Sequence, residues 1–300
     1  MLLSNPLAHP FLAPLGWTLA GLFASAFVAL LLTVRGHWQM LSTSVLFERW
    51  RTWLLIAPLF SLVVLSGPLA VALFAAAAAV QGSREYGRLM GLPTMDGALL
   101  LVAGVAAPMA CLVPPDGRLA LAVVLVPLLA SLPALLSQDA HAGAQRVTRL
   151  AFGLWYLPAT LSTMVLLERH PHGGPGLLVA LGLAVGLSDV AAFTVGRILR
   201  GPKLAPRLSP SKTWAGVTGN VVGAALGLFL VRDLSPAAPV LIGIVALGAV
   251  WGDLLESLLK RDAGAKDAGA CLPGFGGLLD RMDSLLVVLP LTYVALEVLP

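Results

Sequence analysis

The most densely charged part of this chain runs from Gly252 to Ser284, although charged residues make up only 11% of the sequence. Asp253, Glu256 and Lys260 recur there at helical spacing, so their side chains are expected on one face of a helix. The helix predicted at the start of this charged segment therefore carries a polar stripe.

A glycine-rich turn, Pro273 to Gly277, leads to a second pair of acids, Asp280 and Asp283, at the start of the last apolar run. Carboxylates three residues apart converge on one helix face. Hard oxygen ligands beside flexible glycines and several cations meet the needs of a magnesium–nucleotide site, in which metal bridges the phosphates and cations neutralise them. A solvated charged loop is the alternative for this segment.

Asp189 stands inside, or at the edge of, another apolar run. An acid in that position is costly in a membrane, and it normally faces a polar cavity, a metal or a cation. A functional role is the default interpretation, and a salt bridge to a nearby Arg is the alternative.

The loop that follows Asp189 combines cations with hydroxyl groups. Its cations are Arg197, Arg200, Lys203, Arg207 and Lys212, and its hydroxyl groups belong to Ser209, Ser211 and Thr213. Hydroxyls and free backbone N–H groups at a helix N-terminus favour a bound phosphate. A plain loop on the positive side of a membrane explains the charges equally well, but it does not explain the hydroxyl cluster.

The elements that must position these residues are membrane helices. The 300 residues are 58% hydrophobic, against about 45–50% in soluble domains. Apolar stretches of about 17–25 residues recur along the chain, as expected when each crosses a bilayer core of about 30 Å. The alternating segments of about ten residues that are typical of a β-barrel are absent. The sequence therefore predicts an all-α, polytopic helical membrane protein.

We expect about nine or ten transmembrane helices in a single membrane domain, with N-terminal spans in 1–175 and catalytic helices and loops in 176–300. The predicted spans are 11–34, 53–66, 68–81, 97–113, 118–137, 150–167, 177–198, 213–231, 238–255 and 283–299. The stretch 53–81 is interrupted by Ser66, Gly67 and Pro68, and it is either one helix or two short ones, because proline removes a helix hydrogen bond.

Charge distribution favours two short helices. With two, all but three of the 19 Lys and Arg residues fall on one side, the exceptions being Arg118, Arg169 and Arg232. The positive-inside rule then places the charged loops in the cytoplasm and both termini outside.

Other sequence features narrow the class of protein. Cys111 and Cys271 have no CxxC partner and no clustered histidines, so we expect neither a disulfide framework nor a zinc site. The net charge of +4 comes from loops between spans, so membrane orientation explains it and no nucleic acid partner is expected. No basic segment precedes the first apolar run, so no cleaved signal is expected.

The residues from Ser257 to Asp283, SLLKRDAGAKDAGACLPGFGGLLDRMD, resemble the signature of the phosphatidate cytidylyltransferases, or CDP-diacylglycerol synthases. That signature reads S-x-apolar-K-R-x4-K-D-x-G-x2-L-P-x-H-G-G-apolar-x-D-R-x-D, and every fixed position but one matches. The segment SPSKTWAG, from Ser209 to Gly216, resembles the family's other block, usually SPKKTWEG. SREYGRL, from Ser83 to Leu89, matches a Glu-aromatic element found in the family.

The resemblance implies a Mg²⁺-dependent nucleotidyltransferase of phospholipid biosynthesis, which joins CTP to phosphatidic acid and releases diphosphate to give CDP-diacylglycerol. A lipid phosphate oxygen attacks the α-phosphorus of CTP while charge builds on the departing diphosphate. Catalysis of such a step is mainly positioning and charge neutralisation.

The resemblance also assigns roles to residues of this chain. The implied catalytic residues are Lys266, Asp267, Asp280 and Arg281, and the implied metal ligands are Asp280 and Asp283, with Asp253 and Asp189 as further candidates. Substrate phosphates are expected at Ser209, Lys212, Thr213, Ser257, Lys260, Arg261, Gly276 and Gly277. Asp267 has two open roles, which are to orient Lys266 or to bind the metal.

Two positions depart from the family pattern. Phe275 replaces the usual histidine and cannot donate a hydrogen bond to a phosphate, and Ala215 replaces the usual glutamate. A CTP-dependent enzyme acting on another lipid acceptor and a divergent inactive paralogue are therefore rival interpretations. A transporter is a third, in which Asp189 and the break at Ser66 to Pro68 would mark a substrate path.

The expected partners are CTP, phosphatidic acid and the lipid bilayer. The expected location is a bacterial inner membrane, with the active site facing the cytoplasm. The sequence leaves open whether the protein forms a homodimer, whether a monovalent cation assists Mg²⁺, and which acyl chains are preferred.

Overall fold

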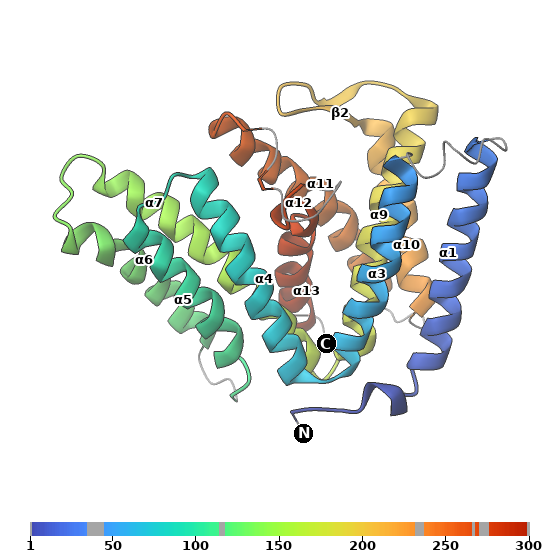
Figure 1. Cartoon of the computed structure of the whole chain (residues 1–300), viewed down its shortest axis with the longest axis horizontal. Coiled ribbons are helices and arrows are strands. Elements are labelled where there is room, and N and C mark those ends of the chain that lie inside the picture. The colour runs from blue at the N-terminus through green and yellow to red at the C-terminus, as the bar shows by residue number, and fades with distance from the viewer. Residues whose placement is uncertain are drawn as a thin grey trace.

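The computed structural model describes residues 2–34, 45–113, 118–231, 237–265, 268–269 and 276–298. Most of these residues are helical, and the helices pack side by side as a bundle (Figure 1). The predicted all-α fold is confirmed, and a helix occupies each of the ten predicted spans.

The N-terminal part consists of η1 (Pro6–Ala8), α1 (Leu12–Val34), α3 (Val45–Leu65), α4 (Pro68–Leu89), α5 (Thr94–Ala110) and α6 (Arg118–Leu136). A single helical segment follows, made of α7 (Gly143–Leu154), the π-helical turn η2 (Trp155–Ala159) and α8 (Thr160–Arg169). The C-terminal part consists of α9 (Pro175–Leu199), α10 (Trp214–Val231), α11 (Ala238–Asp262), α12 (Leu279–Met282) and α13 (Leu285–Val298).

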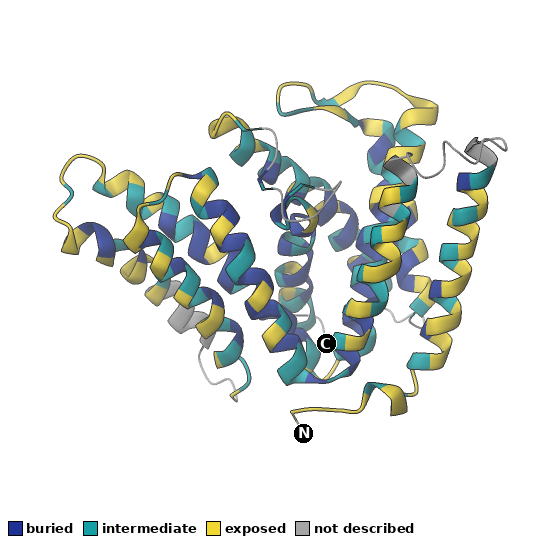
Figure 2. Ribbon diagram, viewed as in Figure 1, coloured by how far each residue is buried: buried dark blue, intermediate teal, exposed yellow. Residues whose placement is uncertain are grey.

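The surface of the bundle is apolar. Five described helices are long and apolar enough to cross a membrane, namely Leu12–Leu31, Gly143–Arg169, Pro175–Leu199, Trp214–Val231 and Ala238–Asp262. Four shorter apolar helices accompany them, at Trp50–Leu65, Thr94–Ala110, Leu125–Leu136 and Leu285–Val298. Large apolar residues are exposed along these helices, with Trp17 81% exposed. Figure 2 shows in yellow the exposed residues along the outer helices. Such a surface suits lipid rather than water, so the chain is an integral membrane protein.

The break between α3 and α4 confirms the predicted pair of helices. α3 ends at Leu65 and α4 begins at Pro68, whose missing N–H is not needed in the first turn of a helix. Gly67 between them has φ +96°, and the N-terminal segment packs against it, with the Ser4 N–H donating to the Ser66 carbonyl at 2.9 Å. A side chain at position 67 would be strained in this conformation.

Two segments predicted as loops are ordered as secondary structure. α4 continues to Leu89 instead of ending near 81, so that Glu85 and Tyr86 lie on a helix. The loop predicted at 197–212 contains the antiparallel strands β1 (Lys203–Ala205) and β2 (Ser209–Thr213), with Lys203 opposite Thr213. The predicted end of the span near 81 and the predicted loop at 197–212 are both based on where the apolar residues stop. That pattern does not indicate whether the polar residues beyond it form a helix or a hairpin.

Helices α9 and α10 pack closely through glycines on α10. A Cβ at position 219 would lie 2.5 Å from the Ala191 carbonyl oxygen, and one at position 216 would lie 3.2 Å from that of Ala192. Small residues of this kind let two membrane helices approach backbone to backbone. The close approach brings the middle of α9, with Asp189, next to the start of α10.

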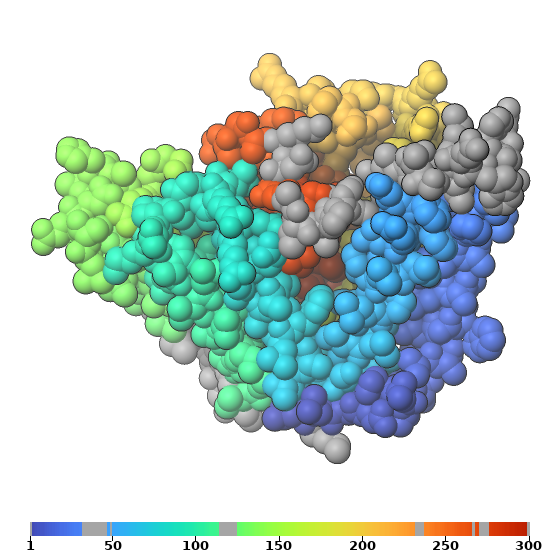
Figure 3. Space-filling model, in the orientation of Figure 1, coloured from blue at the N-terminus to red at the C-terminus, as the bar shows by residue number. Residues whose placement is uncertain are grey.

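The polar segments gather at one end of the bundle. The end of α4, the β1–β2 hairpin and the end of α11 lie there, and the chain ends lie toward the opposite end (Figure 1). In the space-filling view the hairpin, in yellow, and the end of α11, in orange, are neighbours at the upper edge (Figure 3). This arrangement agrees with the alternating direction of the spans that is expected when residues 53–81 form two short helices.

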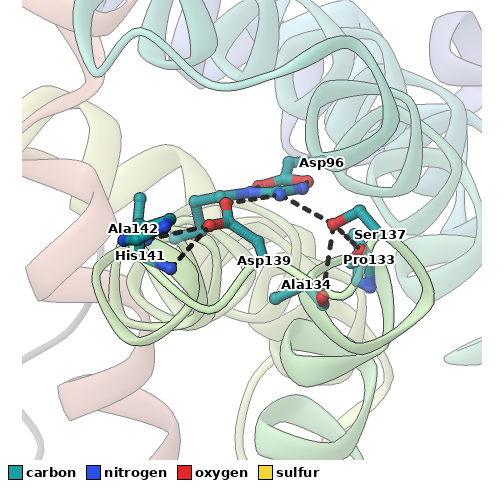
Figure 4. Close-up of polar contacts among 8 residues, drawn as sticks. Asp96, Pro133, Ala134, Ser137, Asp139, His141 and Ala142 are labelled. Carbon is teal, nitrogen blue, oxygen red and sulfur yellow. Dashed lines mark hydrogen bonds and ion pairs between the residues drawn. The ribbon is translucent and has the colours of Figure 1, made fainter.

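A separate ion-pair network joins the start of α5 to the α6–α7 connection (Figure 4). The Arg146 guanidinium donates to both carboxylate oxygens of Asp96, at 2.6 and 3.2 Å, and to an Asp139 oxygen at 3.0 Å. Asp96 is almost fully buried, so the ion pair with Arg146 offsets the cost of removing its carboxylate from water.

Candidate active site

Three carboxylates converge where α11 passes the junction of α12 and α13. Asp253 and Glu256 lie on one face of α11, and Asp283 faces them from the junction. One ligand oxygen from each lies within 4.8 Å of the others, and Glu256 and Asp283 are buried. We refer to Asp253, Glu256 and Asp283 as the acidic cluster.

Gly252 makes this convergence possible. A Cβ at that position would lie 2.6 Å from the Asp283 carbonyl carbon and 2.8 Å from the Ser284 Cα, distances that real side chains essentially never show. The backbone of α11 therefore contacts the α12–α13 junction directly. This contact brings Asp253, the next residue, close to Asp283.

The acidic cluster fits a divalent cation. Its donors are carboxylate oxygens, the hard ligands that Mg²⁺ prefers. Among the described residues, the buried Oε1 of Glu256 has no hydrogen-bond partner. An orphaned carboxylate oxygen is costly unless a cation or water meets it, so this donor set matches the expected metal.

Asp280 lies beside the cluster but is already paired. Its Oδ1 accepts from Lys260 Nζ at 2.8 Å, and its Oδ2 accepts from the backbone N–H groups of Gly277 at 2.8 Å and Ala268 at 3.1 Å. Burial by itself raises the pKa of Asp280, but its interaction with Glu256 and the hydrogen bonds from Lys260 and the Gly277 amide outweigh burial and lower the pKa to about 2. Asp280 is therefore ionised at neutral pH.

Lys260 connects Asp280 to the cluster. Its Nζ also donates to Glu256 Oε2 at 2.7 Å, one helical turn back along α11. The polar stripe expected on α11 is thus confirmed, and a single cation neutralises part of the charge of two acids.

A cavity of about 820 Å³ opens next to the acidic cluster, between α9, the hairpin, α10 and α11. The predicted site residues that line it are Asp189, Ser209, Lys212, Thr213, Asp253 and Arg281. Arg197, Arg200 and Lys203 add further positive charge to its wall. The two charged segments of the sequence, far apart along the chain, therefore form one site.

The hairpin carries Lys212 and Thr213 into this cavity. Lys212 forms an ion pair with Asp253, which ties the hairpin to the acidic cluster. The Thr213 hydroxyl accepts from the Gly216 N–H at 3.1 Å and so caps the start of α10. Asn220, one turn further along α10, lines the cavity, and its buried Oδ1 has no partner among the described residues.

The remaining predicted site residues have other positions. Ser257 and Arg261 lie on the last turns of α11 and do not line the cavity, and Arg261 is exposed. Gly276 and Gly277 precede α12. Lys266 and Asp267 lie outside the described residues, as do Phe275 and Cys271.

The site includes residues that the sequence analysis did not assign to it. Glu256 completes the acidic cluster, and its place one turn after Asp253 was the available signal. Asn220 lies inside an apolar span, where a polar side chain is a functional signal of the same kind as Asp189.

Comparison with known proteins agrees with this geometry. An acidic cluster beside a cation-lined cavity is a candidate site for metal-assisted chemistry on phosphates. Residues 47–299 match the model of the cytidylyltransferase family, and the chain belongs to that family.

Curated relatives carry the name phosphatidate cytidylyltransferase. A protein from Pseudomonas aeruginosa is 34% identical over 230 residues, covering 73% of this chain and 84% of its own length. One from Brucella suis is 42% identical over 149 residues, covering 48% of this chain and 55% of its own length. One from Mycobacterium leprae is 38% identical over 136 residues, or 44% of each chain. The chain thus spans about half the length of the Brucella and Mycobacterium relatives in these alignments.

Proposed function

We propose that this protein transfers the cytidylyl group of CTP to phosphatidic acid, giving CDP-diacylglycerol and diphosphate. The observation that carries the proposal is a cavity in which Asp253 of the acidic cluster lies with Lys212, Arg281 and the hydroxyls of the hairpin. The family and the names of its relatives support the same reaction.

In the proposed reaction, a phosphate oxygen of the lipid forms a bond to the α-phosphorus of CTP, and the bond from that phosphorus to the β-phosphate oxygen breaks. Diphosphate leaves with the electron pair of the broken bond. No covalent enzyme intermediate is needed, so the protein contributes mainly orientation and charge neutralisation.

The residues of the site divide this work. Asp253, Glu256 and Asp283 would hold Mg²⁺, which supplies charge neutralisation across the phosphates when bound. Lys212 and Arg281 would contact phosphate oxygens from the cavity wall, and Ser209 would donate a hydrogen bond. The hydrogen bond from Lys260 to Asp280 would fix the position of the α12 turn relative to the cluster.

We further propose that the cavity faces the cytoplasm of a bacterial cell, where CTP is available. The polar end of the bundle carries most of the Lys and Arg, which is the end that the positive-inside rule places in the cytoplasm. The apolar outer surface would keep the lipid substrate in the same membrane as the site.

The test is formation of CDP-diacylglycerol by the purified full-length protein in detergent, from labelled CTP and phosphatidic acid, with and without MgCl₂. Metal-dependent product is expected, and the Asp283→Asn variant serves as the inactive control. Product from Phe275→His but not from the natural chain would mark a weakened enzyme. Product with a polyprenyl phosphate but not with phosphatidic acid would show that the acceptor is another lipid. No product with either lipid would contradict the proposal.

A further inference from the structure

A buried carboxyl group from the N-terminal half of the chain reaches the turn that carries Asp280 and Asp283. Glu85, near the end of α4, is only 2% exposed. Its Oε1 accepts from the Leu278 N–H at 3.1 Å, and its Oε2 accepts from the Leu279 N–H at 2.8 Å. These contacts join residues that are more than 190 positions apart in the sequence.

The surroundings of Glu85 are shaped to admit this carboxyl group. The Gln81 side-chain amide donates to its Oε1 at 2.8 Å, one turn back on α4. A Cβ at position 277 would lie 2.6 Å from Glu85 Oε2, and one at position 269 would lie 2.9 Å from the Glu85 carboxyl carbon. Glycine at both positions therefore leaves the space that the carboxyl group fills.

The turn held by Glu85 has little stability of its own. α12 is four residues long, and a single helical turn leaves its first N–H groups without intrahelical partners and is marginal in isolation. Glu85 satisfies two of these N–H groups. Asp280 satisfies the N–H group just before the turn, by accepting from the Gly277 N–H at 2.8 Å.

We infer that Glu85 is a positioning residue of the site: through the Leu278 and Leu279 amides it sets the orientation of the turn that presents Asp280 and Asp283. Glu85 itself lies outside the acidic cluster and does not line the cavity. Its effect passes through the turn to Asp283 and, through Asp280, to Lys260. The catalytic consequence rests on the proposed function, whereas the contact itself does not.

The first arm of the test uses activity. Glu85→Gln keeps the size of the side chain but replaces one of its two acceptor oxygens with an NH₂ group that opposes an amide N–H. We expect kcat to fall about 10- to 100-fold, the range typical of residues that orient metal ligands, and the MgCl₂ concentration for half-maximal activity to rise. The KM for CTP is expected to change little.

The matched control is Asp96→Asn, which also converts a buried carboxyl of the N-terminal half into an amide but lies in the Arg146 network. It is expected to lower the melting temperature without changing kcat or the MgCl₂ midpoint. A merely structural role for Glu85 predicts the same pattern for both variants, and that result would overturn the inference.

The second arm does not depend on activity. Hydrogen exchange of the full-length protein in detergent is expected to show faster exchange at Leu278 and Leu279 in Glu85→Gln, with Asp96→Asn unchanged there. Unchanged exchange at these amides in Glu85→Gln contradicts the inference. If the natural protein makes no CDP-diacylglycerol but Glu85→Gln still releases these amides, the proposed function fails while the contact stands.

Discussion

Two groups of charged residues inside this bundle are organised in opposite ways. In the Arg146 network, each carboxylate faces the guanidinium, which also donates to the Ser137 hydroxyl at 2.9 Å (Figure 4). In the acidic cluster, three carboxylates lie within 4.8 Å of one another. Lys212 pairs with Asp253 and Lys260 with Glu256, but Glu256 Oε1 has no partner among the described residues.

The difference separates a structural use of charge from a functional one. When a buried acid pairs with a bidentate Arg, the charge of the acid is neutralised and the pair joins two elements of the fold. Like charges gathered in a buried place are unfavourable unless something else binds there, which is why such sites are candidates for metal and substrate. Removing Asp283 from the cluster and removing Asp96 from the Arg146 network should therefore have opposite effects on stability.

The largest effect is expected from Asp283→Asn in the acidic cluster. Losing one metal ligand should lower turnover at least about 100-fold, because the cation contributes several kcal/mol of charge stabilisation. The melting temperature without added metal should stay the same or rise, because one of three like charges is gone. Assay of turnover and thermal unfolding on one preparation checks both; a clear drop in melting temperature would place Asp283 among the structural acids.

Gly252→Ala tests how the cluster is assembled. The new methyl group would overlap the backbone at Asp283, so α11 has to move away, at a cost of about 1–3 kcal/mol, and turnover should fall with it. Gly243→Ala on the same helix is the control, since nothing lies within 4 Å of its Cβ position. Equal melting temperatures for the two variants would show that Gly252 is not needed for close packing.

Asp96→Asn tests the Arg146 network. The variant leaves a guanidinium without its most buried partner, so the melting temperature should fall by roughly 5 °C while kcat stays within about twofold of the natural protein. Thermal unfolding and steady-state kinetics measure the two quantities. A loss of kcat with an unchanged melting temperature would reverse the contrast between the regions.

The smallest expected effect is the pH dependence of Asp139. Hydrogen bonds from the Ala142 N–H and from Arg146 hold the pKa of Asp139 below its usual value. A lowered folded-state pKa means that the stability from Asp139 is present above the unfolded pKa of about 3.9 and is lost as the pH falls through the folded pKa. Asp139→Asn should therefore lower the melting temperature by less than about 2 °C at pH 7. Scans from pH 7 to pH 2 should show this difference vanish in acid, and a difference that grows in acid would contradict the assignment.

Much of the fold was predictable because the bilayer imposes a simple pattern on sequence. Runs of apolar residues long enough to cross a membrane located each helix, and Pro68 after Gly67 located the break between α3 and α4. The signal failed at polar ends, where α4 extends to Leu89 and the hairpin forms at 203–213. Helix α4 continues there because Glu85 and Tyr86 find partners elsewhere in the bundle, and local sequence does not contain those partners.

The candidate site was predictable in its residue types and only partly in its geometry. Spacing placed Asp253 beside Glu256, and the family resemblance pointed to Asp283 and Lys212. The same reasoning treated Asp280 as a leading metal ligand, whereas the structure surrounds it with Lys260 and two backbone N–H groups. The metal assignment of Asp280 stays a prediction.

The sequence by itself determined that this is a helical membrane protein with its charge gathered in two C-terminal segments, because hydrophobicity and helical spacing are local properties. Only the tertiary structure decided that those segments share one cavity, that Gly252 lets Asp253 meet Asp283, and that Glu85 from α4 holds the turn between α11 and α13. These are contacts between distant parts of the chain, and their geometry depends on how helices pack against one another rather than on any one stretch of residues.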